Sequence, residues 1–237
     1  MKYASATYVE ETRIGFVFLR THTWQHHVLR VAINDLKRLA GEPSPQGGTL
    51  LDVGCGQGRS FRYLRDVFAP ARMLGLDADP HSIDLSRAEA EREGIAVDLF
   101  ASDCARIDLA DASVDIVFCH QTFHHLVEQE RALDEFWRVL KPGGLLLFAE
   151  STKAYIDSWV IRWFFRHPMH VQKSADEYLA MLRERGFVFT DTQVSLPYLW
   201  WSRAKDFGLL ERWGIKAAPP VGKREETLVN VAARKPG

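Results

Sequence analysis

The feature that most restricts the fold is a regular alternation of strand-like and helix-like segments between residues 49 and 151. Short apolar runs are separated by stretches with helical spacing, several of which close on glycine or proline. The expected strands are 49–55, 72–78, 96–103, 115–120 and 145–151, and the expected helices are 59–68, 79–94 and 128–144. This alternation predicts an α/β fold in which parallel strands are joined by right-handed crossovers and helices cover both faces of the sheet.

The two flanks of this region have a different pattern. Residues 13–40 show helical spacing of apolar residues and are followed by a linker rich in glycine and proline at 41–48. Near the other end, a helix is expected at 174–186, and two further strands are expected at 187–195 and 227–234. About thirty residues separate these two strands, which is far more than a hairpin requires.

A glycine-rich loop, "LLDVGCGQGRS" (50–60), directly follows the first expected strand and contains Gly54, Gly56 and Gly58. Glycine allows a sharp turn and lets a ligand touch the backbone. In open parallel sheets, ligands bind beyond the carboxyl ends of the strands. Arg59 stands where a dinucleotide fingerprint needs its third glycine, and the Gly-Lys-Ser/Thr ending of a P-loop is absent. The loop therefore predicts a different ligand, the alternative being that its glycines serve only helix–strand packing.

Three carboxylates lie at the ends of the first three expected strands. Asp52 precedes the glycines, where a carboxylate favours a cationic partner over a pyrophosphate. Asp77 ends the second strand and is placed to accept hydrogen bonds from ribose hydroxyls. Asp103 ends the third strand and is placed to accept from an exocyclic amino group of a purine. Together they favour a ligand that carries an ammonium, a ribose and an aminopurine.

Four segments carry a family resemblance: "LLDVGCGQG", "LGLDADP", "ASDCARIDLADASVDIVFCHQTFHHL" and "RVLKPGGLLLFAES". In this order and spacing, from about residue 49 to 151, the chain resembles the class I S-adenosylmethionine-dependent methyltransferases, in the broad group of small-molecule and quinone-biosynthetic enzymes. The resemblance implies a Rossmann-like, seven-stranded, mostly parallel sheet with one antiparallel strand near the C-terminal end. It also implies a methyltransferase activity with S-adenosyl-L-methionine as the cofactor.

The resemblance also implies which residues bind this cofactor. The glycine loop would surround the methionyl part of the cofactor, and the end of the fourth strand would lie beside the methionyl chain. The end of the second strand would hold the ribose and flank the adenine. The end of the third strand would contact the edge of the adenine. In chain order the set is Asp52, Gly54, Cys55, Gly56, Gly58, Asp77, Ala78, Asp103, Cys104 and His120.

Histidines after the fourth strand are the candidate catalytic groups. A general base is needed only where the acceptor holds its proton tightly, and histidine suits this role because its pKa is near neutral. His124 and His125 are the expected candidates, and the alternative is that they only position the acceptor. His167 and His170 can face the site from a lid, but they lack a third ligand at suitable spacing, so no metal site is expected.

Tryptophan-rich connections predict where the acceptor binds. The chain is expected to be a single methyltransferase domain (1–237) with an N-terminal helical lid (1–40) and a cofactor-binding core (49–151). Two insertions (152–175 and 196–225) are expected to form a helical, aromatic substrate cap. The expected substrate-binding residues are Trp24, Trp163, Trp200 and Trp201. Their rings can line an apolar pocket for the acceptor. The alternatives are that they form the core of the cap itself or the surface of a homodimer.

Composition restricts the substrate class. The chain has 30 basic and 31 acidic residues, a formal net charge of -1, which argues against a protein that neutralises many phosphates. The three cysteines lack a CxxC spacing, and no apolar run is long enough to span a membrane. We therefore expect a cytoplasmic methyltransferase for a small hydrophobic or aromatic acceptor, with O, N, S or C as the attacked atom. The alternatives are a nucleic-acid or protein methyltransferase and a non-catalytic cofactor-binding module.

Overall fold

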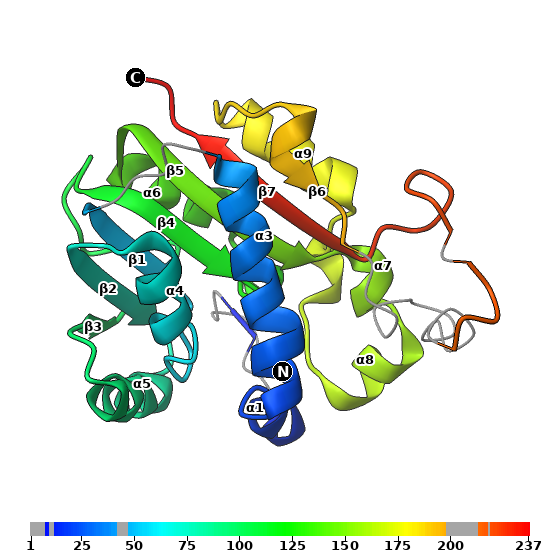
Figure 1. Cartoon of the computed structure of the whole chain (residues 1–237), viewed down its shortest axis with the longest axis horizontal. Coiled ribbons are helices and arrows are strands. Elements are labelled where there is room, and N and C mark those ends of the chain that lie inside the picture. Colours follow the sequence, from blue (N-terminus) through cyan, green and yellow to red (C-terminus); the bar gives the residue numbers. More distant parts are fainter. Residues whose placement is uncertain (1–7, 10–11, 42–46, 198–212, 218) are drawn as a thin grey trace.

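A seven-stranded sheet forms the centre of the molecule. The computed structural model describes residues 8–9, 12–41, 47–197, 213–217 and 219–237. The strands are β1 (Thr49–Val53), β2 (Arg72–Asp77), β3 (Asp98–Ala101), β4 (Val114–His120), β5 (Leu140–Ser151), β6 (Val194–Ser195) and β7 (Leu228–Arg234). Their order is β3-β2-β1-β4-β5-β7-β6 (Figure 1). The first five strands are parallel to one another, and β7 is antiparallel to its neighbours β5 and β6. The predicted Rossmann-like sheet with one antiparallel strand is confirmed.

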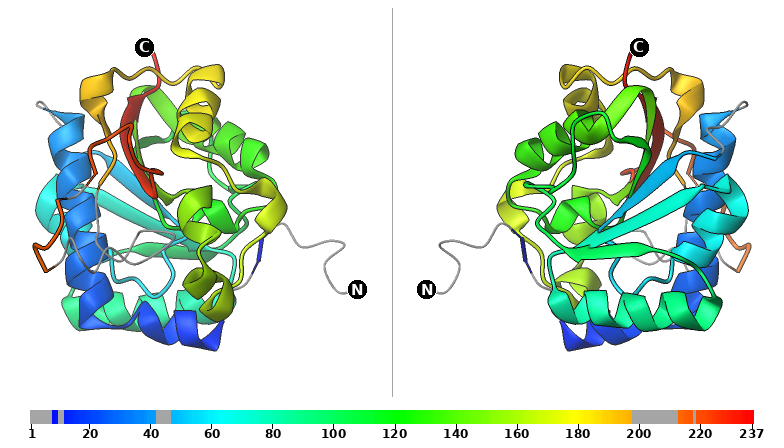
Figure 2. Two further views of the ribbon diagram at one scale, coloured as in Figure 1. Left: turned by 90° about the vertical axis from the view of Figure 1, so that its right-hand side faces the viewer. Right: turned by 90° about the vertical axis from the view of Figure 1, so that its left-hand side faces the viewer.

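Helices cover both faces of this sheet. The described helices are α1 (Arg13–Phe18), α2 (His22–Trp24), the π-helical η1 (Gln25–Leu29), α3 (Arg30–Ala40), α4 (Phe61–Phe68), α5 (Pro80–Glu93), η2 (Phe123–His125), α6 (Gln129–Val139), α7 (Lys153–Ile156), α8 (Trp159–Phe164), η3 (Met169–Val171), α9 (Ala175–Glu184) and η4 (Asp191–Gln193). Buried side chains of α3, α4 and α5 form one core with the sheet, and those of α6 and α9 form the second. Figures 1 and 2 show α3 and α6 on opposite sides of the strands.

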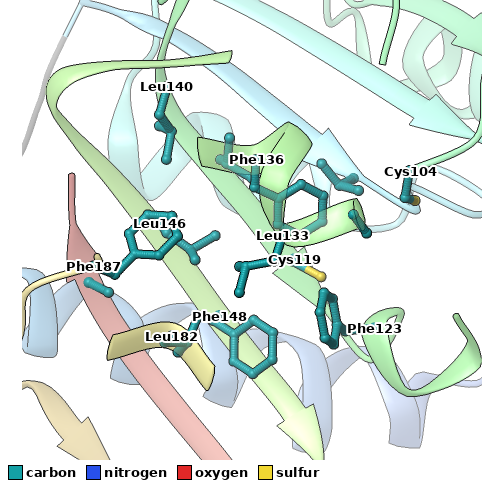
Figure 3. Packing of buried hydrophobic residues seen from close by; sticks show 14 of the residues in the cluster. Cys104, Cys119, Phe123, Leu133, Phe136, Leu140, Leu146, Phe148, Leu182 and Phe187 are labelled. Carbon is teal, nitrogen blue, oxygen red and sulfur yellow. The ribbon is translucent and has the colours of Figure 1, made fainter. Parts of the chain in front are cut away.

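The core between α6 and the sheet supports the turn that follows β4. Figure 3 shows Phe136 of α6 gathered with Cys119 of β4 and Phe148 of β5. The ring of Phe123 in η2 packs edge-on against Phe148 at a centroid distance of 5.3 Å and lies 6.0 Å from the ring of Phe136. All four side chains are almost completely buried. Burial of rings in this way holds η2, and with it the neighbouring histidines, against the sheet.

The expected continuous helix over residues 13–40 is interrupted. α1 ends at Phe18, and Thr21 begins the next helix because its side chain accepts a hydrogen bond from the backbone N–H of Trp24 at 3.2 Å. The chain then passes through the π-helical η1 before α3. The predicted apolar spacing holds in α3, where Ile33 and Leu36 are fully buried.

Two other predicted boundaries were wrong. The helix expected over 128–144 ends at Val139, and "KPGG" lies inside β5, where Gly143 adopts a φ of +77° and its N–H donates to the carbonyl of Lys235. The strand expected over 187–195 is reduced to β6 and one bridge, between Val188 and Arg234. Within 187–195, the side chain of Gln193 accepts a hydrogen bond from the backbone N–H of Thr190. This bond closes the turn η4, which takes the place of strand pairing.

The N-terminal segment lies against the connection that follows β5. The hydroxyl of Thr12 donates a hydrogen bond to the carbonyl of Phe164 at 2.6 Å, and the rings of Phe18 and Phe165 meet edge-on. Figure 2 shows α1 and α8 on the same side of the molecule. Among the described residues, no helix has the length and apolarity needed to cross a membrane.

Candidate functional site

Three adjoining cavities lie where the strand order reverses, at the carboxyl ends of β1 and β4. This is the position at which open α/β sheets bind their ligands. The largest cavity has a volume of about 640 Å³, and the two smaller ones have volumes of about 90 Å³ and 80 Å³. We call them the main, the histidine and the Asp52 cavity. Leu19 and Gln121 line all three of them, so the cavities meet at these two residues.

The glycines after β1 have separate roles. Gly54 has a φ of +70°, and a Cβ built there would meet the Thr122 side chain at 2.2 Å, so this position requires glycine. Gly56 has a φ of +53° and faces open space, and it lines both the main and the Asp52 cavity. Gly58 instead packs against Phe61, whose ring a Cβ would meet at 2.7 Å. Gly54 and Gly56 therefore face the cavities, whereas Gly58 lies against the helix.

Asp77 joins the ends of β1 and β2 at the main cavity. One carboxylate oxygen accepts a hydrogen bond from the N–H of Gly56 at 2.9 Å, and the other accepts from the N–H of Asp79 at the same distance. Burial raises the pKa of Asp77, although these backbone N–H groups act in the opposite direction. Ala78 lies beside it on the cavity wall. The arrangement presents a carboxylate to the cavity at a fixed orientation.

Asp52 is a buried carboxylate in its own cavity. It is 2% exposed, and the hydroxyl of Ser60 donates a hydrogen bond to it. No ion pair joins Asp52 to another residue in the described part of the chain. Burial raises the pKa of Asp52 to about 7, and the nearby Asp77 adds to this effect. A cationic ligand group would relieve the unpaired charge. Cys55 and His120 line the same cavity.

The expected adenine-side residues differ in placement. Cys104 lines the main cavity, and burial raises the pKa of its thiol, which keeps it protonated and unreactive. Asp103 does not line any of the three cavities, and its carboxylate accepts a hydrogen bond from the N–H of Ala105 at 2.8 Å. Here Asp103 closes a turn beside the cavity.

Glu150 of β5 organises the turn that carries the histidines. It is fully buried, and one carboxylate oxygen accepts hydrogen bonds from the backbone N–H groups of Thr122 and Phe123, at 2.9 and 2.8 Å. The other oxygen lies 2.6 Å from Nδ1 of His124. This contact assigns the proton to Nδ1 and leaves Nε2 of His124 as the basic nitrogen. The sequence interpretation missed Glu150.

The histidines come together at the histidine cavity. His124, His125 and His167 all line it, although His167 lies 42 residues further along the chain than His125. Burial lowers the pKa of His167 to about 3 and that of His125 well below its usual value, and the neighbouring His124 lowers both further. Both rings are therefore neutral at pH 7. His120 stands apart, facing Trp24, and burial lowers its pKa to about 4.

Apolar side chains form most of the rest of the histidine cavity. They come from the N-terminal helices, the connection after β5 and the start of β7: Phe18, Leu19, Trp24, Val28, Ile156, Ile161, Phe165 and Leu228. Trp24, an expected substrate residue, is among them. Trp163 is 79% exposed and lies outside the cavities. Trp200 and Trp201 lie outside the described residues.

The N-terminal segment covers the main cavity. The N–H of Val9 donates a hydrogen bond to the carbonyl of His125 at 3.0 Å, and the amide of Gln57 donates to the carbonyl of Phe16 at the same distance. Both Val9 and Phe16 line the cavity. These bonds join the described part of the segment to both the glycine loop and the histidine turn.

Comparisons with known proteins agree with this geometry. Residues 51–148 match the model of the methyltransferase domain family. The chain is 31% identical over 120 residues to a demethylmenaquinone methyltransferase of Deinococcus radiodurans, covering 50% of each protein. It is 33% identical over 139 residues to a human thiol S-methyltransferase, covering 56% of this chain and 54% of the relative. The chain spans about half the length of the curated relatives it matches.

A solved structure has the same fold. The S-adenosylmethionine-dependent methyltransferase of Aquifex aeolicus aligns with a TM-score of 0.64 at 21% identity, covering 93% of this chain and 97% of the other. This likeness in fold therefore extends beyond the segment that the family model matches.

Proposed function

We propose that the protein, whose residues 51–148 match the methyltransferase domain family, transfers a methyl group from S-adenosylmethionine to a small apolar acceptor. The observation that supports the proposal most directly is the meeting of the three cavities at Leu19 and Gln121. A cofactor in the main and Asp52 cavities and an acceptor in the histidine cavity would face each other at this point.

The residues fit the cofactor. Asp77 presents its carboxylate to a cavity of about 640 Å³, suited to a ribose. The buried Asp52 has no cationic partner among the described residues, which suits it to an amino group. Gly56 leaves the backbone open between them. When bound, S-adenosylmethionine supplies an electrophilic methyl group on a sulfonium. The chain binds and orients the two reactants, which is the main protein contribution to such an in-line transfer.

The histidine cavity favours the reactive end of an apolar acceptor. Its volume of about 90 Å³ admits a small group, and aliphatic and aromatic side chains form most of its wall. Polar atoms come from the three histidines, Gln121, Ser151 and Tyr155. Because His125 and His167 have low pKa values, they are weak bases. We therefore assign His125 and His167 to orientation of the acceptor rather than to removal of its proton.

A labelling experiment tests the proposal. The purified protein is incubated with S-adenosylmethionine carrying a labelled methyl group and with fractions of a metabolite extract, nucleic acid or protein. We expect the label in low-molecular-weight, organic-soluble products. Label in nucleic acid or protein would instead support the alternative acceptors, and binding of the cofactor without transfer to any fraction would support a non-catalytic module.

Replacing Asp77 should weaken cofactor binding. We expect Asp77→Ala to lower the affinity for S-adenosylmethionine by about 1.5–3 kcal/mol, because it removes a charged acceptor for hydroxyl donors. Calorimetry measures the affinity, and a thermal melt checks that the loop remains folded. Asp84→Ala is the matched control, since Asp84 is exposed on α5 and pairs only with Arg87 among the described residues. Equal affinities of the two variants would contradict the ribose assignment.

Aromatic side chains should differ in their effect on the acceptor. Phe165 lines the histidine cavity, whereas Trp163 is exposed outside it. We expect Phe165→Ala to lower kcat/KM for the acceptor by roughly tenfold to a hundredfold, because the pocket loses apolar contact, and to leave cofactor affinity unchanged. Trp163→Ala should have little effect on either. A larger loss in Trp163→Ala would show that the acceptor binds elsewhere.

A further inference from the structure

Three imidazole rings form a compact cluster at the wall of the histidine cavity. Within the described part of the chain, one ring nitrogen from each of His124, His125 and His167 lies within 4.8 Å of the other two. The ring centroids are separated by 4.4 Å (His124–His125), 4.7 Å (His125–His167) and 5.1 Å (His124–His167). The rings come from two segments of the chain, so the cluster depends on the fold.

Two buried side chains hold this cluster in place. Glu150 fixes the ring of His124 through Nδ1, and a carboxylate behind one ring nitrogen commonly orients the other nitrogen toward a metal. The amide nitrogen of Gln172 donates to the carbonyl of His124 at 2.7 Å and to the carbonyl of Pro168 at 3.1 Å. Gln172 therefore ties the turn that carries His124 to the residue that follows His167.

We propose that His124, His125 and His167 bind one divalent transition-metal ion of the zinc class. Three imidazole nitrogens with an open fourth position form a known type of zinc site, whereas Mg²⁺ and Ca²⁺ prefer oxygen ligands. Zinc–nitrogen bonds of about 2.0–2.1 Å place the nitrogens roughly 3.4 Å apart in a tetrahedral site. Side-chain rotation must therefore draw the rings closer. His167 can make part of this movement because residues 165–168 lie outside helices and strands.

The open position of the ion would face the histidine cavity. A hydroxyl or thiol bound there would release its proton to solvent water more readily, so the acceptor would be held as an oxyanion or thiolate with its reactive atom at a fixed place. This use of the ion rests on the proposed methyl transfer. The binding of the ion does not, and it can be tested without any acceptor.

Metal binding is measured on tag-free full-length protein stripped with a chelator. We expect Zn²⁺ to bind at one ion per chain, and Co²⁺ to give the visible absorption bands of a low-coordinate site with nitrogen ligands. His167→Ala should weaken binding on the order of a hundredfold or more, since removal of even a supporting partner costs tenfold to a hundredfold. Affinity for S-adenosylmethionine, measured in parallel, should stay unchanged.

Two controls keep the result specific. His170 is exposed on η3 in the same connection, and His170→Ala should bind the ion as the unchanged protein does. His22 and His26 stack at 3.8 Å on the N-terminal helices, and their double replacement by alanine tests for adventitious binding there. Absence of the Co²⁺ bands, or their persistence in a folded His167→Ala, would overturn the proposal. Unchanged cofactor binding in either case would leave the proposed function standing.

Discussion

Replacing Glu150 with alanine is expected to destabilise the protein by about 3–5 kcal/mol, the usual cost of removing one member of a buried, hydrogen-bonded polar pair. The change leaves the backbone N–H groups of Thr122 and Phe123 without their acceptor and also removes the partner of His124. Denaturant unfolding measures the free energy. We expect the midpoint to fall with little change in slope, because the surface exposed on unfolding stays similar.

Glu150→Gln separates the structural role from the chemical one. The amide keeps the volume and one oxygen to accept from the two backbone N–H groups, so most of the stability should return. Its NH₂ group would then face Nδ1 of His124 and force the ring proton to Nε2. This variant should be folded, bind S-adenosylmethionine and fail to bind Zn²⁺ or Co²⁺. If Glu150→Ala unfolds at the same denaturant concentration as the unchanged protein, the contacts of Glu150 contribute no stability.

Cofactor affinity is expected to fall steeply with pH below neutrality. In the ligand-free protein the pKa of Asp52 is raised to about 7, so acidification neutralises the carboxylate that would pair with the cofactor's amino group. We expect the dissociation constant to rise toward tenfold per pH unit below pH 7 and to be flat above it. The stability of the ligand-free protein changes with pH in the opposite direction. Because the pKa of Asp52 is higher in the folded than in the unfolded chain, the free energy of unfolding falls as the pH rises toward 7. Calorimetry across pH 5–9 checks the first effect.

Asp52→Asn should remove this pH dependence. At pH 8 the variant should bind S-adenosylmethionine about 30- to 1000-fold more weakly, which corresponds to about 2–4 kcal/mol for an ammonium left without its buried partner. Asp84→Asn, which changes an exposed carboxylate of α5, is the control and should match the unchanged protein. A pH-independent affinity in the unchanged protein would show that Asp52 does not face the cationic group.

The placement of the glycine loop and Asp77 at the main cavity could be predicted because its signals are local. Gly54 and Gly56 follow a buried strand, and Asp77 ends the next one, so position in the sequence translates directly into position at one edge of a parallel sheet. The same logic placed Asp103 at the next strand end. The sequence could not show that the Asp103 side chain closes a turn beside the cavity. One side-chain rotation decides whether the carboxylate accepts from the N–H of Ala105 or points into the cavity.

The histidine cavity depends on contacts between distant segments. Glu150 lies in an apolar strand, 26 residues from His124 along the chain, and nothing in the run "LLLFAES" indicates that its carboxylate supports a turn after another strand. In the sequence His167 stands near only His170, and its approach to His124 and His125 of η2 depends on the fold. At 187–195 the predicted strand is shortened, because hydrogen bonds of the Thr190 turn replace the ladder.

The separation of the cavities has a consequence for how such a protein can diverge. The cavities meet at Leu19 and Gln121, and most of the apolar wall of the histidine cavity comes from residues 18–28 and 156–165. These two stretches lie outside the matched domain at 51–148. Residues 156–165 line only the histidine cavity, so substitutions there can change its wall without touching Asp52, Asp77 or the glycine loop, whereas Leu19 and Trp24 also line the Asp52 cavity. If the histidine cavity holds the acceptor, as we propose, the connection after β5 is where the choice of acceptor can change while the matched domain stays intact.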